Sequence, residues 1–349
     1  MQSVVIHTEG EVRVEERPTP AIEAADEVLV RVAYSGLCGS DIPRIFAKGA
    51  HFYPITLGHE FSGRVVACGD RVTDLQQHDA VACVPLLPCF NCPECQRHYY
   101  SLCKHYQFVG SRSHGGNAEF IVVKRANLVK LPANVSLLQG AFIEPITVGL
   151  HAIQLAGGCQ GKEVIIIGAG TIGQLAIQCA RAMGARSVTA IDINDDRLKL
   201  ARQIGAENAF NSAELSPSEI AERLQERRFD QLILETAGTP QTVGLALDIA
   251  GPRAQIALVG TLHKDLHLSY STFSQILRKE LTLLGSWMNY SAPWPGEEWQ
   301  QAMKLFQSAD LALEPLIASI DRPQQYAASV AALAGNPMQG KIMLKLGEE

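Results

Sequence analysis

Residues 164–192 constrain the fold of this chain more than any other stretch, because strand, turn, helix and strand patterns follow one another there without a break. Val164–Ile167 is a short apolar run of mostly β-branched side chains, which is typical of a strand buried on both faces. Residues 174–183 predict a helix that stops at Gly184, and Ser187–Ile191 predicts the next strand. The succession predicts a βαβ unit within a parallel sheet.

The turn of this unit reads Gly-Ala-Gly-Thr-Ile-Gly, which is the spacing of a dinucleotide-binding loop. Gly168 would make the tight turn, Gly170 would let the backbone approach a pyrophosphate, and Gly173 would let helix and strand pack closely. Free N–H groups at the helix N-terminus would bind the phosphates. The cofactor-binding residues that we predict are Gly168, Gly170, Thr171, Ile172, Gly173, Asp192, Arg197 and Val259.

Asp192 decides which dinucleotide we expect. It follows Gly173 by 19 residues, where a carboxylate would accept hydrogen bonds from the ribose hydroxyls. Because a carboxylate repels a 2′-phosphate, the sequence favours NAD over NADP. Arg197 would neutralise such a phosphate if it faced the ribose, but the pattern favours a place for it on the following helix.

Elsewhere the chain divides into a strand-rich part and an alternating part. After residue 150, strand and helix patterns alternate up to residue 288. This alternation predicts an α/β fold with a doubly wound parallel sheet of the Rossmann type. A polar stretch begins at residue 210. Residues 1–35 alternate short strands with turns, and no long helix pattern appears before about residue 40. We expect a β-rich catalytic domain over 1–150 with a metal-binding lobe at 86–106, a dinucleotide domain over 151–288, and a return of 289–349 to the first domain.

The last strand of the parallel sheet is expected at Glu280–Trp287. Its apolar stretch Leu281–Leu284 would leave an unpaired edge, which invites pairing with a second copy across a two-fold axis. We therefore predict a homodimer, with a tetramer also possible.

Composition excludes several classes of protein. With 30 basic and 36 acidic residues among 349, the net charge is −6, which argues against a nucleic-acid-binding surface. The N-terminus has no basic, apolar leader, and no apolar run approaches the roughly 20 residues of a membrane span. We expect a soluble, cytoplasmic protein.

Four of the nine cysteines lie within fifteen residues, which indicates a metal site rather than disulfides. Cys89, Cys92, Cys95 and Cys103 match a closed, structural zinc site of four thiolates. An iron–sulfur cluster is the main alternative, but its cysteine run continues with three residues to a Cys-Pro pair, whereas seven residues and Lys104 stand here.

A second set of potential zinc ligands is spread over the first 150 residues. Cys38 lies in a glycine-rich stretch, His59 lies in Gly-His-Glu, and Glu144 precedes Pro145. Cys and His are more often structural when they occur alone. Upstream of a dinucleotide unit, however, a Cys, His and Glu set predicts a catalytic zinc ion with an open position.

These three motifs together resemble the zinc-dependent medium-chain alcohol and polyol dehydrogenases over essentially the whole chain. Glu144-Pro145 is similar to the polyol branch, since alcohol dehydrogenases proper place a cysteine ligand there. The resemblance implies a GroES-like catalytic domain, NAD and two zinc ions per chain. Further stretches resemble members that oxidise a polyol phosphate, galactitol 1-phosphate, to tagatose 6-phosphate; they are 35–41, 53–63, 79–90, 141–151 and 277–296. Sorbitol, L-iditol and L-threonine are the alternative substrates.

The resemblance also implies roles for individual residues. Cys38, His59 and Glu144 would hold the catalytic zinc ion, and Glu60 would be an outer carboxylate able to swing onto it. Ser40 would pass on the proton of the substrate hydroxyl, and Asp41 would orient His59 by accepting its second ring N–H. This chain departs from the family at Pro43, where many members carry the histidine that ends the proton relay.

The phosphate of such a substrate needs cationic or N–H donors, and Arg44, Arg112 and His114 are the candidates. Two other classes of protein remain as alternatives: a zinc-ribbon interaction protein, and a zinc-free quinone reductase or crystallin-like relative. The charge argues against the first, and the zinc-competent residues argue against the second.

Overall fold

The computed structural model describes nearly the whole chain, and the described residues are 1–224, 230–308, 311–336 and 338–348. They form two compact units. Unit 1 contains Met1–Glu144, Tyr290–Ser308 and a segment from Leu313 onward, and unit 2 contains Pro145–Asn289 and a short segment that ends at Ala312. The first division falls between Glu144 and Pro145, inside a helix, and not at residue 150 as the sequence indicated.

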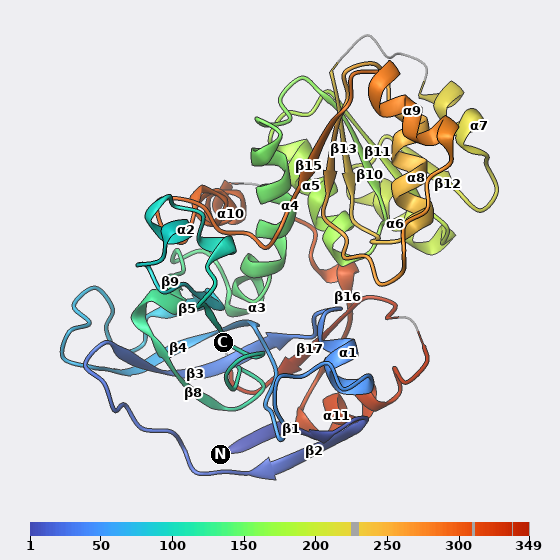
Figure 1. Cartoon of the computed structure of the whole chain (residues 1–349). Helices are drawn as coiled ribbons and strands as arrows, with labels where there is room; N and C mark the ends of the chain where they lie inside the picture. The colour runs from blue at the N-terminus through green and yellow to red at the C-terminus, as the bar shows by residue number, and fades with distance from the viewer. Residues whose placement is uncertain (225–229, 309–310, 337, 349) are drawn as a thin grey trace. The chain divides into compact units, whose positions relative to one another are not determined.

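Unit 2 is built on a parallel sheet, which among the described residues has six strands (Figure 1). They are β10 (Glu163–Ile167), β11 (Ser187–Asp192), β12 (Asn208–Asn211), β13 (Gln231–Glu235), β14 (Gln255–Leu258) and β15 (Thr282–Gly285). The order is β12-β11-β10-β13-β14-β15, so the direction of strand addition reverses beside β10. This is the doubly wound order of a Rossmann sheet, and the predicted fold class is confirmed.

Helices connect these parallel strands. The helices of unit 2 are α4 (Ile143–Leu155, which begins in unit 1), α5 (Thr171–Ala182), α6 (Asp195–Gln203), α7 (Pro217–Arg223), α8 (Pro240–Ile249) and α9 (Tyr270–Arg278). α5 packs on α6, and α8 packs on both α7 and α9. The sequence pattern also predicts a helix over 216–225, and residue 225 lies outside the described part of the chain.

Two expectations for unit 2 were wrong. The stretch from residue 210 is not merely polar, because β12 pairs there with β11. The last strand is β15, which is shorter than the predicted Glu280–Trp287 since Glu280 has a φ of 50°, a value that an extended strand does not allow. Sequence analysis also missed α9, in which no residue is buried.

Unit 1 is rich in strands, as the sequence predicted. Its main sheet runs β16-β17-β3-β4-β5-β9, and β8 also pairs with β3. The strands are β1 (Gln2–Thr8), β2 (Glu11–Glu16), β3 (Glu27–Gly36), β4 (Glu60–Cys68), β5 (Ala80–Cys83), β6 (Leu86–Leu87), β7 (Gln107–Phe108), β8 (Phe120–Lys124), β9 (Leu128–Lys130), β16 (Ile317–Asp321) and β17 (Lys341–Lys345). The helices are α1 (Asp41–Phe46), α2 (Pro93–Gln96), α3 (Leu137–Gly140), α10 (Glu297–Ser308) and α11 (Pro323–Ala331), with 3₁₀ turns at Tyr100–Leu102, Arg125–Asn127 and Glu314–Leu316.

No helix of the described residues has the length and apolar character needed to cross a membrane.

Gly173 shows how closely strand and helix pack in the dinucleotide unit. A Cβ atom at this position would lie 1.9 Å from the carbonyl oxygen of Gly168, so even alanine would force the backbone apart. We expect Gly173→Ala to lower the free energy of unfolding by about 1–3 kcal/mol, measured by chemical denaturation.

Gly244→Ala is the matched control. Gly244 lies inside α8 in the same unit, and a Cβ atom there would meet nothing within 4 Å. This substitution should stabilise the protein by up to about 1 kcal/mol, because alanine favours helix over glycine. Equal effects of the two substitutions would contradict the packing argument.

Candidate functional site

The pairing of β3 with β4 brings the first candidate metal ligands together. The strands are antiparallel, and Gly36 at the end of β3 lies opposite Glu60 at the start of β4. Cys38, just after β3, therefore meets His59, just before β4. The ligand atoms of Cys38, His59 and Glu60 lie within 4.8 Å of one another.

Gly58 makes the backbone path to His59 possible. Its φ is 99°, and a Cβ atom would lie 2.4 Å from Asn117 Oδ1 and 2.7 Å from Ser35 Oγ. Gly58 therefore positions the imidazole of His59, as well as making the turn.

The surroundings of His59 are strongly negative. Its ring is buried, and Nδ1 has no hydrogen-bond partner among the described residues but faces Asp41 Oδ1 at 3.6 Å. Burial alone would lower the pKa of His59, but the charges of Asp41 and Cys38 outweigh burial and raise it to about 10. A half-buried cysteine and a buried imidazole in such a negative setting fit a bound cation, and the donor types fit zinc.

Ser40 and Asp41 are bound to this centre. Ser40 Oγ donates a hydrogen bond to Cys38 Sγ at 3.2 Å, and Asp41 Oδ2 accepts the backbone N–H of Cys38 at 3.4 Å. Arg44 Nη1 donates to Ser40 Oγ at 2.9 Å and to Asp41 Oδ1 at 3.0 Å.

Glu144 lies in the first turn of α4 and is buried. The negative charge of Glu144 contributes to the raised pKa of His59. Its carboxylate is not part of the group of ligand atoms within 4.8 Å of one another that Cys38, His59 and Glu60 form. Glu60, which the resemblance made an outer carboxylate, is in that group. The ligand role of Glu144 stays a prediction.

Sequence analysis missed Lys341, the first residue of β17. Its ammonium group is buried and donates to Glu60 Oε2 at 2.5 Å and to the carbonyl oxygen of Leu37 at 3.3 Å. Burial opposes the charged form, but the charges of Glu60 and Cys38 keep the pKa of Lys341 raised. A single lysine before an apolar run gives no signal of burial in the sequence.

The four clustered cysteines form the second candidate metal site. Their Sγ atoms lie within 4.8 Å of one another, and three of the Sγ pairs are separated by 3.5, 3.9 and 4.0 Å. Tetrahedral zinc with Zn–S bonds of about 2.3 Å requires sulfurs about 3.8 Å apart. All nine cysteines are free, so the disulfide alternative was wrong. Backbone N–H groups of Asn91 and then Cys92 lower the pKa of Cys89 to about 6, which favours a thiolate.

The candidate cofactor residues gather at the carboxyl ends of the parallel strands. Ala169 N–H donates to Asp192 Oδ2 at 2.6 Å, so the turn after β10 is bound to the end of β11. Arg197 lies in α6, and its Nη1 is 3.8 Å from the same carboxylate oxygen. Val259 follows β14, and its N–H donates to the carbonyl oxygen of Glu235 at 2.9 Å.

Glu235 is a further residue that sequence analysis did not single out. It is fully buried at the end of β13, and its Oε1 accepts the N–H groups of Ala237 and Gly238 at 2.9 and 2.8 Å. Burial raises its pKa. Its side chain and carbonyl oxygen together hold the loops after β13 and β14.

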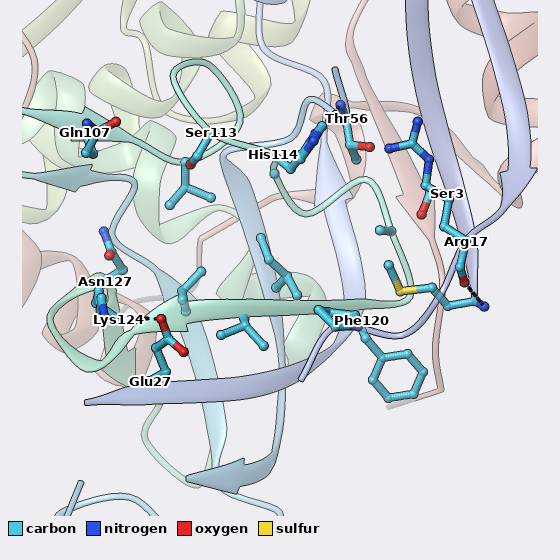
Figure 2. A pocket seen from close by; sticks show the side chains of 18 of the residues that line it. Ser3, Arg17, Glu27, Thr56, Gln107, Ser113, His114, Phe120, Lys124 and Asn127 are labelled. Atoms are coloured by element: carbon cyan, nitrogen blue, oxygen red, sulfur yellow. Dashed lines mark hydrogen bonds and ion pairs between the residues drawn. The ribbon is translucent and has the colours of Figure 1, made fainter. Parts of the chain in front are cut away.

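The three candidates for phosphate binding have different neighbours. Arg44 lies beside Ser40, and Arg112 stacks on Tyr106 with its guanidinium 4.3 Å from the ring centroid. His114 Nδ1 accepts the N–H of Thr56 at 3.2 Å, and its ring lines a cavity of about 600 Å³ with Ser3, Arg17 and Thr56 (Figure 2). Neither Arg44 nor Arg112 is among the described residues that line this cavity.

Comparison with known proteins identifies the family. Residues 24–133 match the alcohol dehydrogenase GroES-like domain, and residues 171–308 match the zinc-binding dehydrogenase domain. Galactitol 1-phosphate 5-dehydrogenase of Escherichia coli (strain K12) is 61% identical over 344 residues, which are 99% of each chain. The chain therefore belongs to the zinc-dependent alcohol dehydrogenase family, as the sequence motifs indicated.

Solved structures agree with this. The crystal structure of galactitol-1-phosphate dehydrogenase from Escherichia coli has a TM-score of 0.97 at 61% identity, covering 99% of this chain and 100% of that one. A putative zinc-binding dehydrogenase from Sinorhizobium meliloti 1021, bound to NADP, has a TM-score of 0.88 at 26% identity over 99% and 98% of the two chains.

The ion pair of Glu60 and Lys341 gives a test of the site's architecture. Lys341→Met would leave the Glu60 carboxylate buried without its counter-charge, and we expect the free energy of unfolding to fall by about 3–5 kcal/mol. Adding Glu60→Gln removes that charge and should restore part of the loss. Chemical denaturation of both single variants and the double variant checks this. If Lys341→Met proves as stable as the parent chain, the pair is not buried as described.

Proposed function

We propose that this chain is an NAD-linked, zinc-dependent dehydrogenase that oxidises galactitol 1-phosphate to tagatose 6-phosphate. The observation that carries the chemistry is the group of the half-buried Cys38 with the buried His59 and Glu60, which is suited to a metal ion. The substrate rests on the 61% identity to galactitol 1-phosphate 5-dehydrogenase over 99% of both chains.

Cys38, His59 and Glu144 would hold the catalytic zinc ion, with Glu60 kept beside it by Lys341. When bound, zinc supplies the Lewis acidity that makes an alcohol acidic near neutral pH, and NAD supplies the hydride acceptor. Asp41 faces His59 Nδ1 and would fix the orientation of the ring.

Ser40 would relay the proton of the substrate hydroxyl: its Oγ would accept that proton as its own O–H proton leaves. Its Oγ already accepts a hydrogen bond from Arg44 Nη1, and its own proton points to Cys38 Sγ. Arg44 does not lose a proton in proteins, and Pro43 has none to exchange. The proton would therefore pass from Ser40 to solvent water.

NAD is the dinucleotide that Asp192 favours. The carboxylate is buried and accepts N–H groups from Ala169 at 2.6 Å and Asn194 at 3.0 Å, which holds it at the end of β11. A negative group held there would bind ribose hydroxyls and repel a 2′-phosphate. Arg197 lies against this carboxylate, and this pairing lowers the capacity of the Arg197 guanidinium to bind a phosphate.

A homodimer, or a tetramer built from it, is the proposed assembly. β15 pairs only with β14 among the described strands, so its other edge is open. Leu283 on this strand and Trp287 just after it are exposed. An exposed apolar edge of this kind favours pairing with a second copy.

Substitution of one cysteine at each site separates the two proposed zinc ions. We expect Cys38→Ala to lower the zinc content from two ions to one and to abolish turnover, with the fold and NAD binding retained. Cys92→Ala should instead lower the melting temperature markedly, because a structural metal contributes directly to folding. Metal analysis, NAD titration and thermal unfolding check this. Normal turnover by Cys38→Ala would refute the zinc mechanism.

The substrate assignment is tested with a panel of alcohols. The parent enzyme is assayed with NAD and NADP on galactitol 1-phosphate, galactitol, sorbitol, L-iditol and L-threonine, with absorbance of the reduced nicotinamide as readout. We expect the highest kcat/KM with galactitol 1-phosphate and NAD. A higher value for an unphosphorylated polyol or for threonine would reject the substrate, and a higher value with NADP would reject the cofactor.

A further inference from the structure

Arg44 has one guanidinium nitrogen engaged and two available. Nη1 donates to the carbonyl oxygen of Ser40, to Ser40 Oγ and to Asp41 Oδ1, at 3.0, 2.9 and 3.0 Å. Nε and Nη2 have no hydrogen-bond partner among the described residues, although only 19% of the side chain is exposed. The Nε–Nη2 edge is the one that binds a phosphate through two parallel hydrogen bonds.

The segment that carries His51 connects Arg44 to the loop that carries Arg112. Tyr53 OH donates to the carbonyl oxygen of Arg44 at 2.6 Å. On the other side, the Phe52 ring packs edge-on against His114 with ring centroids 5.4 Å apart, two residues beyond Arg112. His51 thus lies in a segment that touches both α1 and the 110–116 loop.

The charges that act on the His51 ring are both positive. Partial burial, and then the positive charges of Arg112 and Arg44, lower the pKa of His51. Within the described part of the chain, these two guanidinium groups are the charges that act on its ring. Nitrogen donors gathered in this way repel one another, and an anion bound between them relieves that repulsion.

We infer that Arg44, His51 and Arg112 form the subsite for the phosphate of the substrate, and that Arg44 joins this subsite to Ser40. The inference rests on the proposed function and deepens it, since it says how a sugar-alcohol phosphate would be distinguished from the free polyol. His114, which accepts the N–H of Thr56 and lines the cavity of Figure 2, is left out of the subsite.

The position of Arg44 gives the subsite a second consequence. One edge of its guanidinium would bind phosphate while Nη1 holds Ser40 Oγ, which in turn donates to Cys38 Sγ. A bound phosphate fixes the guanidinium and so fixes the hydroxyl that takes part in proton removal. Binding energy from a remote part of the substrate is thereby used at the reacting centre, so loss of the phosphate lowers kcat as well as raising KM.

The test compares Arg112→Ala and Arg44→Lys with a surface control, Arg13→Ala, on galactitol 1-phosphate and on galactitol. A hydrogen bond from an arginine to the phosphate is charge-assisted and therefore strong. Arg112→Ala should lower the ratio of kcat/KM on galactitol 1-phosphate to kcat/KM on galactitol about 10- to 100-fold. Arg44→Lys keeps the charge but loses the fork, and should lower kcat on both substrates. Arg13→Ala should keep the parent ratio, since Arg13 pairs with Glu11 in β2.

A binding measurement complements turnover. Calorimetric titration of the zinc-loaded protein with inorganic phosphate should show binding that galactitol 1-phosphate competes away and that Arg112→Ala weakens at least about tenfold. Thermal unfolding verifies that each variant is folded. If the Arg112→Ala ratio stays at the parent value, or if His114→Ala alone lowers it, the subsite is overturned while the proposed function stands. The opposite outcome is also possible to recognise. If the protein binds phosphate through Arg112 but does not oxidise galactitol 1-phosphate, the subsite is upheld and the proposed function is overturned.

Discussion

The buried ion pair of Glu60 and Lys341 connects the parts of unit 1 on which the candidate metal site depends. Glu60 begins β4, Lys341 begins β17, and both strands pair with β3. The pair is almost wholly buried, so its geometry is under strong constraint, because a charge left alone there would be costly. Gly36 leaves room for the carboxylate, since a Cβ atom at this position would lie 2.6 Å from Glu60 Oε2. Cys38 and His59 are brought together above this pair by the ends of the same two strands.

Acidic groups lie close to Cys38, and basic groups lie next to these acidic groups. Asp41, Cys38 and Glu144 all favour a positive charge on the buried His59, which is why its pKa is raised and not lowered. Arg44 and Lys341 balance part of this charge from outside. A divalent cation would complete that balance, and the resulting centre would be near neutral, as suits a site that must bind an anionic substrate close by.

The sequence predicted what local pattern and fixed spacing determine. The β10–α5–β11 unit and the four-cysteine lobe were recognised because each is encoded within a short stretch. α9 was missed because its apolar side chains face solvent, and β12 was missed because it is short and half polar. Lys341 was not predictable, since its burial depends on Glu60, 281 positions away. The different neighbours of His114, Arg44 and Arg112 depend in the same way on contacts between distant loops.

The central claim is that Cys38 and His59, with a carboxylate, hold a metal ion in unit 1. Anomalous diffraction at the zinc edge from crystals of the zinc-loaded protein tests it most directly. The account predicts two peaks, one among the four lobe cysteines and one in contact with Cys38 Sγ, the His59 ring and the Glu144 carboxylate. A single peak in the lobe, with none at Cys38 and His59, would contradict it.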